Sequence, residues 1–323
     1  MVAIVRHTIS FTAPLLACRR ASGFRSSSFA SAFLCFRSPH TALSTPTSST
    51  TCRRSWSYRA GGDDAGGSFE VVQFPCLADN YGYLIHDQTT GETAAIDTPC
   101  AASYRRELDK RGWKLTLILN THKHHDHVGG NLELKTEGVT VYGPACDGNI
   151  PGMDVSLKEE DVVRFGNTNA KVIDVGGHTI GHIAFYFPAE KTAFVGDSLF
   201  SLGCGRMFEG SKQQFWSSLQ KLRNLPDDTL LYCAHEYTES NAKFAMSVEP
   251  GNVDLMKRVE TIKARRARGE PTVPSMVGDE KLTNPFLRGD LSAEIRKNVG
   301  ASVSDSNADV FGKIRREKDN FSG

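Results

Sequence analysis

The sequence Thr-His-Lys-His-His-Asp-His at residues 121–127 places four imidazoles and one carboxylate within seven residues. The whole chain of 323 residues has only ten histidines, so this density needs a physical reason. Neutral imidazole nitrogen is the commonest protein ligand for zinc, iron and copper. A protein core would have to find a partner for every ring nitrogen, and a solvated surface has no use for such a cluster. The run therefore predicts a metal site, in preference to a surface histidine tract.

The residues on either side of the run predict where this site lies. Residues 115–120, Leu-Thr-Leu-Ile-Leu-Asn, are almost continuously apolar and β-prone, as a buried strand should be. Residues 128–130, Val-Gly-Gly, permit a tight turn, so we expect the run to form a loop in which the ligands converge. The C-terminal end of a buried strand is where α/β sheets place their chemistry.

Three later segments repeat this order of an apolar strand followed by a candidate ligand. They are Gly-Gly-His-Thr-Ile-Gly-His at 176–182, Gly-Asp-Ser at 196–198 and Ala-His-Glu-Tyr at 234–237. A lone histidine after a strand is more often a structural residue than a ligand. Together, however, the four strand ends deliver at least five histidines and two aspartates to one edge of the predicted sheets. Such a set of nitrogen and oxygen ligands, without thiolate, suits two divalent metal ions.

The order of predicted elements indicates the fold class. Strand-like runs occupy 69–74, 82–86, 94–97, 115–120, 139–142, 162–165, 172–175, 183–187, 193–195 and 229–233, with helix-like runs at 102–111, 131–137 and 213–225. This mixture of β-meanders and single helices favours an α/β core of two sheets with helices outside over a doubly wound parallel sheet. After residue 239 only helix-like runs remain, at 240–247, 253–268, 291–299 and 308–318, and they predict a small helical second domain.

Residues 1–60 differ in composition from the rest of the chain. They contain eight arginines, many Ser and Thr, and no Asp or Glu, which is typical of an organellar transit peptide. A disordered tail without an address is the alternative. We expect this leader to end near residues 60–62 and to direct the chain to the mitochondrial matrix, with the plastid as the alternative.

The remainder of the chain is acidic and its cysteines are scattered. Without the leader, 30 basic residues remain against 37 acidic ones, a balance near −7 that argues against nucleic acid as a partner. No apolar run approaches the roughly 20 residues of a membrane span. Five of the eight cysteines lie outside the leader without a Cys-x-x-Cys pair, so we expect reduced thiols. We expect a monomer.

The motif series Thr-His-x-His-x-Asp-His, Gly-His-Thr-x-Gly-His, Gly-Asp-Ser and His-Glu-Tyr-Thr resembles that of the metallo-β-lactamase superfamily. Within it, residues 69–321 resemble glyoxalase II, the hydroxyacylglutathione hydrolases. The metal motifs indicate only the superfamily. The resemblance to glyoxalase II in particular rests on three motifs of the helical region, Val-Glu-Pro-Gly-Asn at 248–252, Thr-Asn-Pro-Phe at 283–286 and Arg-Arg-Glu-Lys-Asp at 315–319. The resemblance implies an αββα two-sheet sandwich, the metallo-β-lactamase fold, in residues 68–238. It also implies a glutathione-binding helical domain in residues 239–323.

The resemblance also implies a binuclear metal site. The first ion would be bound by His122, His124 and His178, the second by Asp126, His127 and His235, with Asp197 bridging both. Zinc is the first expectation, with iron or manganese as alternatives. His125 and His182 match no ligand position, and Lys123 stands where relatives often carry His.

The implied reaction is hydrolysis of S-D-lactoylglutathione to D-lactate and glutathione, a step of methylglyoxal detoxification. Asp126 would orient or deprotonate the attacking water. Glutathione would contact Arg206, Phe208, Tyr237, Arg315 and Lys318. Arg315 and Lys318 share a face of the predicted helix and supply positive charge for the two carboxylates of glutathione. Phe208 stands where some relatives carry Tyr, so one hydroxyl donor is lost.

Two other functions fit the same fold. A persulfide dioxygenase would use a single iron and O₂ and would need fewer metal ligands than this chain offers. A non-catalytic binding protein usually loses ligands, and this chain retains the full set of seven. A β-lactamase or a nuclease agrees less well with the acidic chain and the basic pair near the C-terminus.

Overall fold

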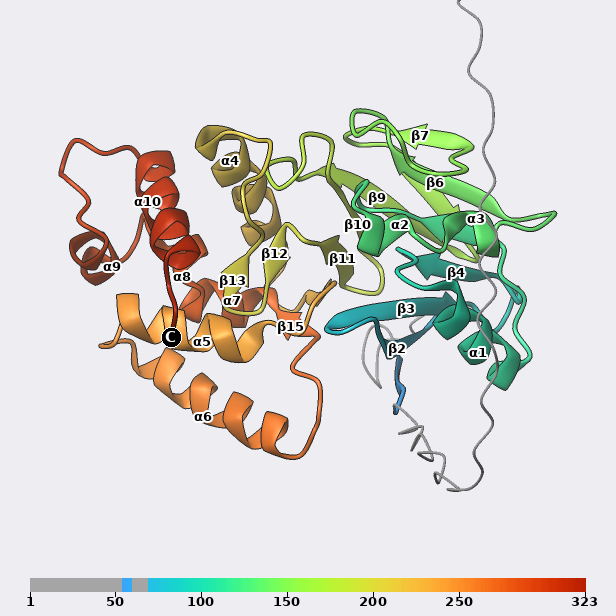
Figure 1. The fold of residues 1–323 in the computed structure, drawn as a ribbon, viewed down its shortest axis with the longest axis horizontal. Coiled ribbons are helices and arrows are strands. Elements are labelled where there is room, and N and C mark those ends of the chain that lie inside the picture. The colour runs from blue at the N-terminus through green and yellow to red at the C-terminus, as the bar shows by residue number, and fades with distance from the viewer. Residues whose placement is uncertain (1–53, 60–68) are drawn as a thin grey trace, which may run out of the picture. The chain divides into compact units, whose positions relative to one another are not determined.

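Two mixed β-sheets pack against each other in the computed structural model of the protein, which describes residues 54–59 and 69–323 (Figure 1). The first sheet has the order β1-β2-β3-β4-β5-β6-β7, formed by Trp56–Arg59, Glu70–Cys76, Asn80–His86, Thr93–Ile96, Leu117–Leu119, Thr140–Pro144 and Val155–Leu157. The second has the order β15-β14-β11-β10-β9-β8, formed by Ser275–Met276, Leu230–Cys233, Thr192–Gly196, Ile183–Phe187, Thr168–Asp174 and Val162–Phe165. A short hairpin joins β12 (Leu199–Phe200) to β13 (Gly203–Cys204).

Helices cover the outer faces of both sheets. On the first sheet, α1 (Ala101–Arg111) buries Tyr104 and Leu108 against Val72 and Leu84, in a cluster that also includes residues of α2 (His125–Val128) and α3 (Asn131–Leu134). On the second sheet, Phe215 of α4 (Lys212–Arg223) belongs to the large apolar cluster that contains every residue of β10, so this cluster includes both faces of that sheet. The expected αββα arrangement is confirmed.

The last part of the chain is mainly helical and packs beside β13 and α4 (Figure 1). Its helices are α5 (Thr238–Val248), α6 (Val253–Ala267), α7 (Val277–Thr283), α8 (Pro285–Arg288), α9 (Ala293–Asn298) and α10 (Asn307–Asp319). Helix α10 begins with a capping box between Ser306 and Asp309, which satisfies backbone donors at its first turn. Its buried residues Phe311 and Ile314 join the same apolar cluster as the two sheets, so this region shares the main core. No helix in the described ranges is long and apolar enough to cross a membrane.

Strand directions explain why the ligand-bearing loops meet. β9 and β11 are both antiparallel to β10, so they run parallel to each other, and β14 pairs parallel with β11. The C-terminal ends of these three strands therefore lie at one edge of the second sheet. In the first sheet, β5 runs parallel to β4 and β6 and ends just before the histidine run.

Several elements differ from the sequence-based expectations. The second half of the histidine run is not a loop, because residues 125–128 form the single helical turn α2. The helix expected at 131–137 is also a single turn, since the backbone is extended again at Lys135. Residues 275–276 form β15 in a region expected to lack strands, and they pair with β14. β7, α7 and α8 were not expected, because each has only three to seven residues, too few for a periodic pattern.

The strand β1 lies inside the range 1–60 that was predicted to be a leader. Trp56 pairs opposite Gln73 of β2, and Trp56 and Tyr58 pack against the core between the sheets. A four-residue alternation of aromatic and polar side chains is too short to be recognised as a strand from sequence. Residues 1–53 and 60 of the predicted leader lie outside the described residues.

Candidate metal centre and substrate pocket

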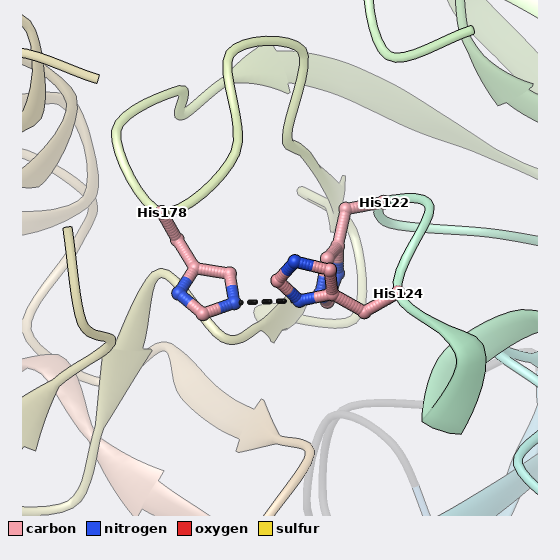
Figure 2. A group of neighbouring side chains, drawn as sticks. All are labelled: His122, His124 and His178. Carbon is pink, nitrogen blue, oxygen red and sulfur yellow. Dashed lines mark hydrogen bonds between the residues drawn. The ribbon is translucent and has the colours of Figure 1, made fainter. Parts of the chain in front are cut away.

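Three imidazoles from two loops converge at one point (Figure 2). His122 and His124 follow β5, and His178 lies between β9 and β10. Nδ1 of His124 lies 3.1 Å from Nε2 of His122 and 3.0 Å from Nε2 of His178. Nitrogen ligands placed tetrahedrally at about 2.1 Å from a zinc ion are about 3.4 Å from one another. The three nitrogens are therefore spaced as the ligands of one small cation would be.

A second group lies next to the first. Oδ2 of Asp126 lies 3.4 Å from Nε2 of His235 and 3.6 Å from Nε2 of His127. Asp126 and His127 belong to α2, whose tight turn points both side chains inward, and His235 follows β14. These three residues offer one carboxylate and two imidazoles, which suit a divalent cation.

Asp197, which follows β11, lies between the two groups. Its Oδ2 is 3.5 Å from Nε2 of His178, while its Oδ1 is 3.5 Å from Nε2 of His127 and 3.4 Å from Nε2 of His235. Oδ1 of Asp197 and Nε2 of His127 are buried and have no hydrogen-bond partner among the described residues. Buried polar atoms are normally paired, so these two atoms fit a site that is completed by metal ions.

Four of the five imidazoles, those of His122, His127, His178 and His235, are held from their outer sides. Nδ1 of His127 donates to Asp97 and Nδ1 of His235 donates to Asp79, both at 2.9 Å, and Nδ1 of His178 donates to the carbonyl oxygen of Arg206 at 2.7 Å. Nδ1 of His122 lies 3.0 Å from the hydroxyl of Thr121. These bonds leave the Nε2 atoms facing the centre of the site, as metal-binding histidines require. His124 is oriented the other way, with Nδ1 inward.

The supporting residues Asp79, Asn80 and Asp97 were missed by the sequence analysis. Asp97 is buried and has a φ of 51°, an uncommon conformation for a residue other than glycine, and its carboxylate accepts from the backbone and hydroxyl of Thr121 as well as from His127. Its one sequence signal was its position at the end of a strand, which the recognised ligands share. Asp79 lies in the turn between β2 and β3, and Asn80 is the first residue of β3; no motif marked either residue.

Burial and neighbouring charges set the ionisation of the site. Burial alone would raise the pKa of Asp197, but the adjacent His127 and His235 hold it well below its ordinary value. Burial would likewise raise the pKa of Asp126, yet His235, His127 and Asn80 together keep it below the usual range. Burial lowers the pKa of His122, which favours the neutral ring that a metal needs. Against the effect of burial, the carboxylate of Asp197 raises the pKa of His127 to about 10 and that of His235 to about 11. The site therefore holds ionised carboxylates beside protonated imidazoles, and a divalent cation would take the place of those ring protons.

Gly196 explains why a glycine precedes the central aspartate. Its φ is +49°, and a Cβ at this position would lie 2.4 Å from Oγ1 of Thr121 and 2.8 Å from the ring of His182. His182 is fully buried, stacks on His122 and accepts a hydrogen bond from the backbone N–H of Asp197 at 3.0 Å. His182 thus positions Asp197. His125 is exposed and belongs to neither ligand group.

A cavity of about 460 Å³ opens onto the two groups. Phe208 is exposed and lies edge-on to His124 and His178, and Tyr237 stacks on His235 with ring centroids 4.7 Å apart. The residues predicted to bind substrate all line this cavity, together with five of the predicted metal ligands; they are Arg206, Phe208, Tyr237, Arg315 and Lys318, with His124, Asp126, His178, Asp197 and His235. His122 and His127 lie buried behind them.

Arg315 and Lys318 differ in their surroundings. Arg315 is 5% exposed, and its guanidinium donates to the carbonyl oxygen of Cys204 at 2.9 Å and to Asp319 at 2.9 and 3.2 Å. Its guanidinium carbon lies 5.1 Å above the ring of Phe286. Most of its donors are therefore engaged within the protein, so Arg315 supports the floor of the cavity in addition to any role in binding.

Comparison with known proteins gives a consistent result. Residues 80–235 match the metallo-beta-lactamase superfamily, and residues 236–321 match the family described as hydroxyacylglutathione hydrolase C-terminus. A hydroxyacylglutathione hydrolase from Methylococcus capsulatus is 52% identical over 256 residues, which cover 79% of this chain and 99% of the relative. One from Hyphomonas neptunium is 52% identical over 254 residues, covering 78% and 98%. The crystal structure of ETHE1 from Myxococcus xanthus is 25% identical, with a TM-score of 0.53, and covers 78% of this chain and 91% of that chain.

Replacement of Arg315 should destabilise the fold as well as alter the cavity. Arg315→Ala leaves the carbonyl of Cys204 and the carboxylate of Asp319 without their partner, so we expect the free energy of unfolding to fall by about 2–4 kcal/mol. The control is Arg316→Ala, because Arg316 is exposed on the same helix. This substitution should change the free energy of unfolding by less than about 0.5 kcal/mol. Urea unfolding measures both, and equal stability of the two variants would contradict the supporting role of Arg315.

Proposed function

The chain belongs to the hydroxyacylglutathione hydrolase family of the metallo-β-lactamase superfamily, and we propose that its substrate is S-D-lactoylglutathione, which it hydrolyses to D-lactate and glutathione. This thioester hydrolase would thereby act in the detoxification of methylglyoxal. One observation carries the choice of substrate: a single cavity contains the candidate metal ligands and also the cationic side chains of Arg206, Arg315 and Lys318. Fixed positive charge beside a hydrolytic centre suits a thioester whose thiol part carries two carboxylates.

We propose that the site holds two divalent cations. His122, His124 and His178 would hold one, Asp126, His127 and His235 the other, with Asp197 shared between them. Zinc is the first choice. Iron and manganese are the alternatives, because nitrogen and oxygen ligands accept all three metals. When bound, such ions polarise a carbonyl oxygen and lower the pKa of a nearby water.

Asp126 is assigned to orient the attacking water. Its carboxylate lines the cavity, and its Oδ2 accepts a hydrogen bond from the side-chain amide of Asn80 at 3.1 Å. Because the pKa of Asp126 is held below its usual range, the group is ionised at neutral pH and is a weak base. It therefore accepts a hydrogen bond from the water more readily than it removes a proton. The leaving thiolate is a tolerable anion, so no strong general acid is required.

Lys318 is assigned to a carboxylate of the glutathione moiety. Its ammonium donates to the backbone and side-chain oxygens of Ser240 at 3.0 and 3.1 Å and lies over the rings of Phe244 and Phe321. Burial, followed by the positive charges of Arg315 and Arg206, lowers the pKa of Lys318 to about 8. Three cations close to one partly exposed carboxylate, that of Asp319, favour the binding of a further anion.

We propose that residues 1–53 act as a leader to the mitochondrial matrix, with the plastid as the alternative, and that the processed chain is a monomer. Because β1 begins at Trp56 and pairs with β2, we place the processing site before residue 54 instead of near 60–62. A C-terminal fluorescent tag on the full chain should follow a mitochondrial marker, and deletion of residues 1–53 should abolish this. Plastid fluorescence, or unchanged mitochondrial import after the deletion, would overturn the assignment.

The purified protein, loaded with zinc, should release thiol from S-D-lactoylglutathione without consuming O₂. His124→Ala should reduce kcat/KM at least about 100-fold, because a ligand of the first ion is lost. His125→Ala is the matched control and should stay near the wild-type value, because its side chain is exposed outside both ligand groups. O₂ uptake with an iron-loaded protein but no thiol release would favour a dioxygenase. Binding of the thioester without turnover would favour a non-catalytic protein.

The pH dependence of kcat/KM should show the ionisation of Lys318. Carboxylate binding needs the ammonium form, so kcat/KM should fall as pH rises through about 8, where Lys318 loses its proton. Lys318→Arg keeps its positive charge above this pH, so the decline should move to higher pH or disappear. The measurement is kcat/KM for the thioester across this range. An unchanged alkaline decline in Lys318→Arg would rule out Lys318 as its source.

A further inference from the structure

We propose that Asp147 positions the first metal site by tying together the two loops that carry its three histidines. The inference rests on the binuclear site of the proposed function, but it concerns a residue that belongs to none of the metal motifs. Asp147 lies after β6, in a connection whose sequence shows no sign of a role at the site. Its side chain is completely buried.

The carboxylate of Asp147 has three hydrogen-bond donors around it, and they come from both loops. Oδ2 accepts from the backbone N–H of Lys123 at 2.8 Å and from the hydroxyl of Thr179 at 3.0 Å. Oδ1 accepts from the backbone N–H of Gly181 at 3.1 Å. Lys123 separates His122 from His124, and Thr179 directly follows His178. One side chain therefore fixes the backbone next to all three ligands.

The close fit of the second loop on the segment around Asp147 supports this reading. A Cβ on Gly181 would lie 2.4 Å from the backbone nitrogen of Asp147 and 2.6 Å from the carbonyl carbon of Cys146. Only glycine permits this approach, which brings the N–H of Gly181 to the carboxylate. Gly181, the second glycine in the Gly-His-Thr-x-Gly-His motif, thus permits the contact with Asp147.

The negative charge of the buried Asp147 is compensated by the ammonium of Lys123, whose backbone N–H donates to Asp147. The ammonium of Lys123 lies 3.9 Å from Oδ1 of Asp147 and 2.8 Å from Oε1 of Glu209. Glu209 also accepts a hydrogen bond from the backbone N–H of Ile180 at 3.0 Å, so a second acid links Lys123 to the loop of His178. Hydrogen bonds to an ionised group are the stronger ones, and the cost of burying Asp147 is met by three of them and a nearby cation.

This arrangement predicts a selective effect on one metal ion. Residues that orient metal ligands from outside typically contribute 10–100-fold to affinity. Asp147→Asn keeps the size of the side chain but replaces one accepting oxygen by an –NH₂ group. Either Gly181 or the pair Lys123 and Thr179 then faces a donor, so the tie between the two loops is weakened. The first ion should then bind about 10–100-fold more weakly. The second ion should bind as in the wild type, because its ligands are oriented by Asp79 and Asp97.

The test uses zinc affinity in two backgrounds that each retain one site. In His235→Ala, which keeps the first group, adding Asp147→Asn should weaken zinc binding about 10–100-fold in competition with a chromophoric chelator. In His178→Ala, which keeps the second group, the same addition should leave zinc affinity unchanged. Thr179→Val removes one donor with little change of shape, and it should give a smaller loss in the first background alone. It also supplies the test if Asp147→Asn does not fold.

Unchanged zinc affinity in the His235→Ala background, or an equal loss in both backgrounds, would overturn the proposal. The thermal midpoint of each metal-free protein measures any general destabilisation by the substitution. A positioning role requires, in addition, that the zinc affinity falls in the His235→Ala background only. The failure of the proposed function would look different. It would appear as wild-type protein that binds fewer than two zinc ions or hydrolyses no glutathione thioester.

Discussion

The carboxylate of Asp197 is the point on which the arrangement of the site depends. Its two oxygens face imidazoles from three different loops, His178 on one side and His127 and His235 on the other. Such a contact is possible only if the loops after β5, β9, β11 and β14 all reach one edge of the two sheets. The parallel alignment of β9, β11 and β14 and the packing of the sheets against each other meet this condition. The close approach is also why residue 196 is glycine, since a side chain there would collide with Thr121 and His182.

The wall of the cavity beside the candidate metal ligands comes from the C-terminal part of the chain. Arg315 of α10 donates a hydrogen bond to the carbonyl oxygen of Cys204 in β13, and Lys318 donates one to the carbonyl oxygen of Ser240 in α5. The helical region is thus joined to the two-sheet core through the cavity wall itself. Because Phe311 and Ile314 of α10 also enter the main core, the positive charges are held beside the candidate metal ligands. The candidate metal ligands and the cationic side chains therefore line one cavity.

Much of this was predictable from sequence because it rests on local patterns. The fully buried strand at 183–187 and the alternating strand at 162–165 have the expected bounds, and each strand end that carries a candidate ligand was recognised by its motif. What sequence did not reveal depends on contacts between distant residues. Asp147 matters because it meets Lys123 and Thr179, which lie 24 and 32 residues away. The burial of Arg315 follows from a bond to Cys204 across 111 residues, and a basic helix gives no sign of it. β1 and α2 escaped notice because four residues are too few to show a period.

The central claim is that one cavity joins a binuclear metal site to a cationic site for the thiol part of the substrate. Anomalous diffraction from crystals of the zinc-loaded protein, soaked with a non-hydrolysable S-conjugate of glutathione, tests both halves together. The account predicts two zinc peaks, one among His122, His124 and His178 and one among Asp126, His127 and His235, with a carboxylate of the ligand at Lys318. A single zinc peak, or a ligand bound away from Arg206 and Lys318, would contradict it.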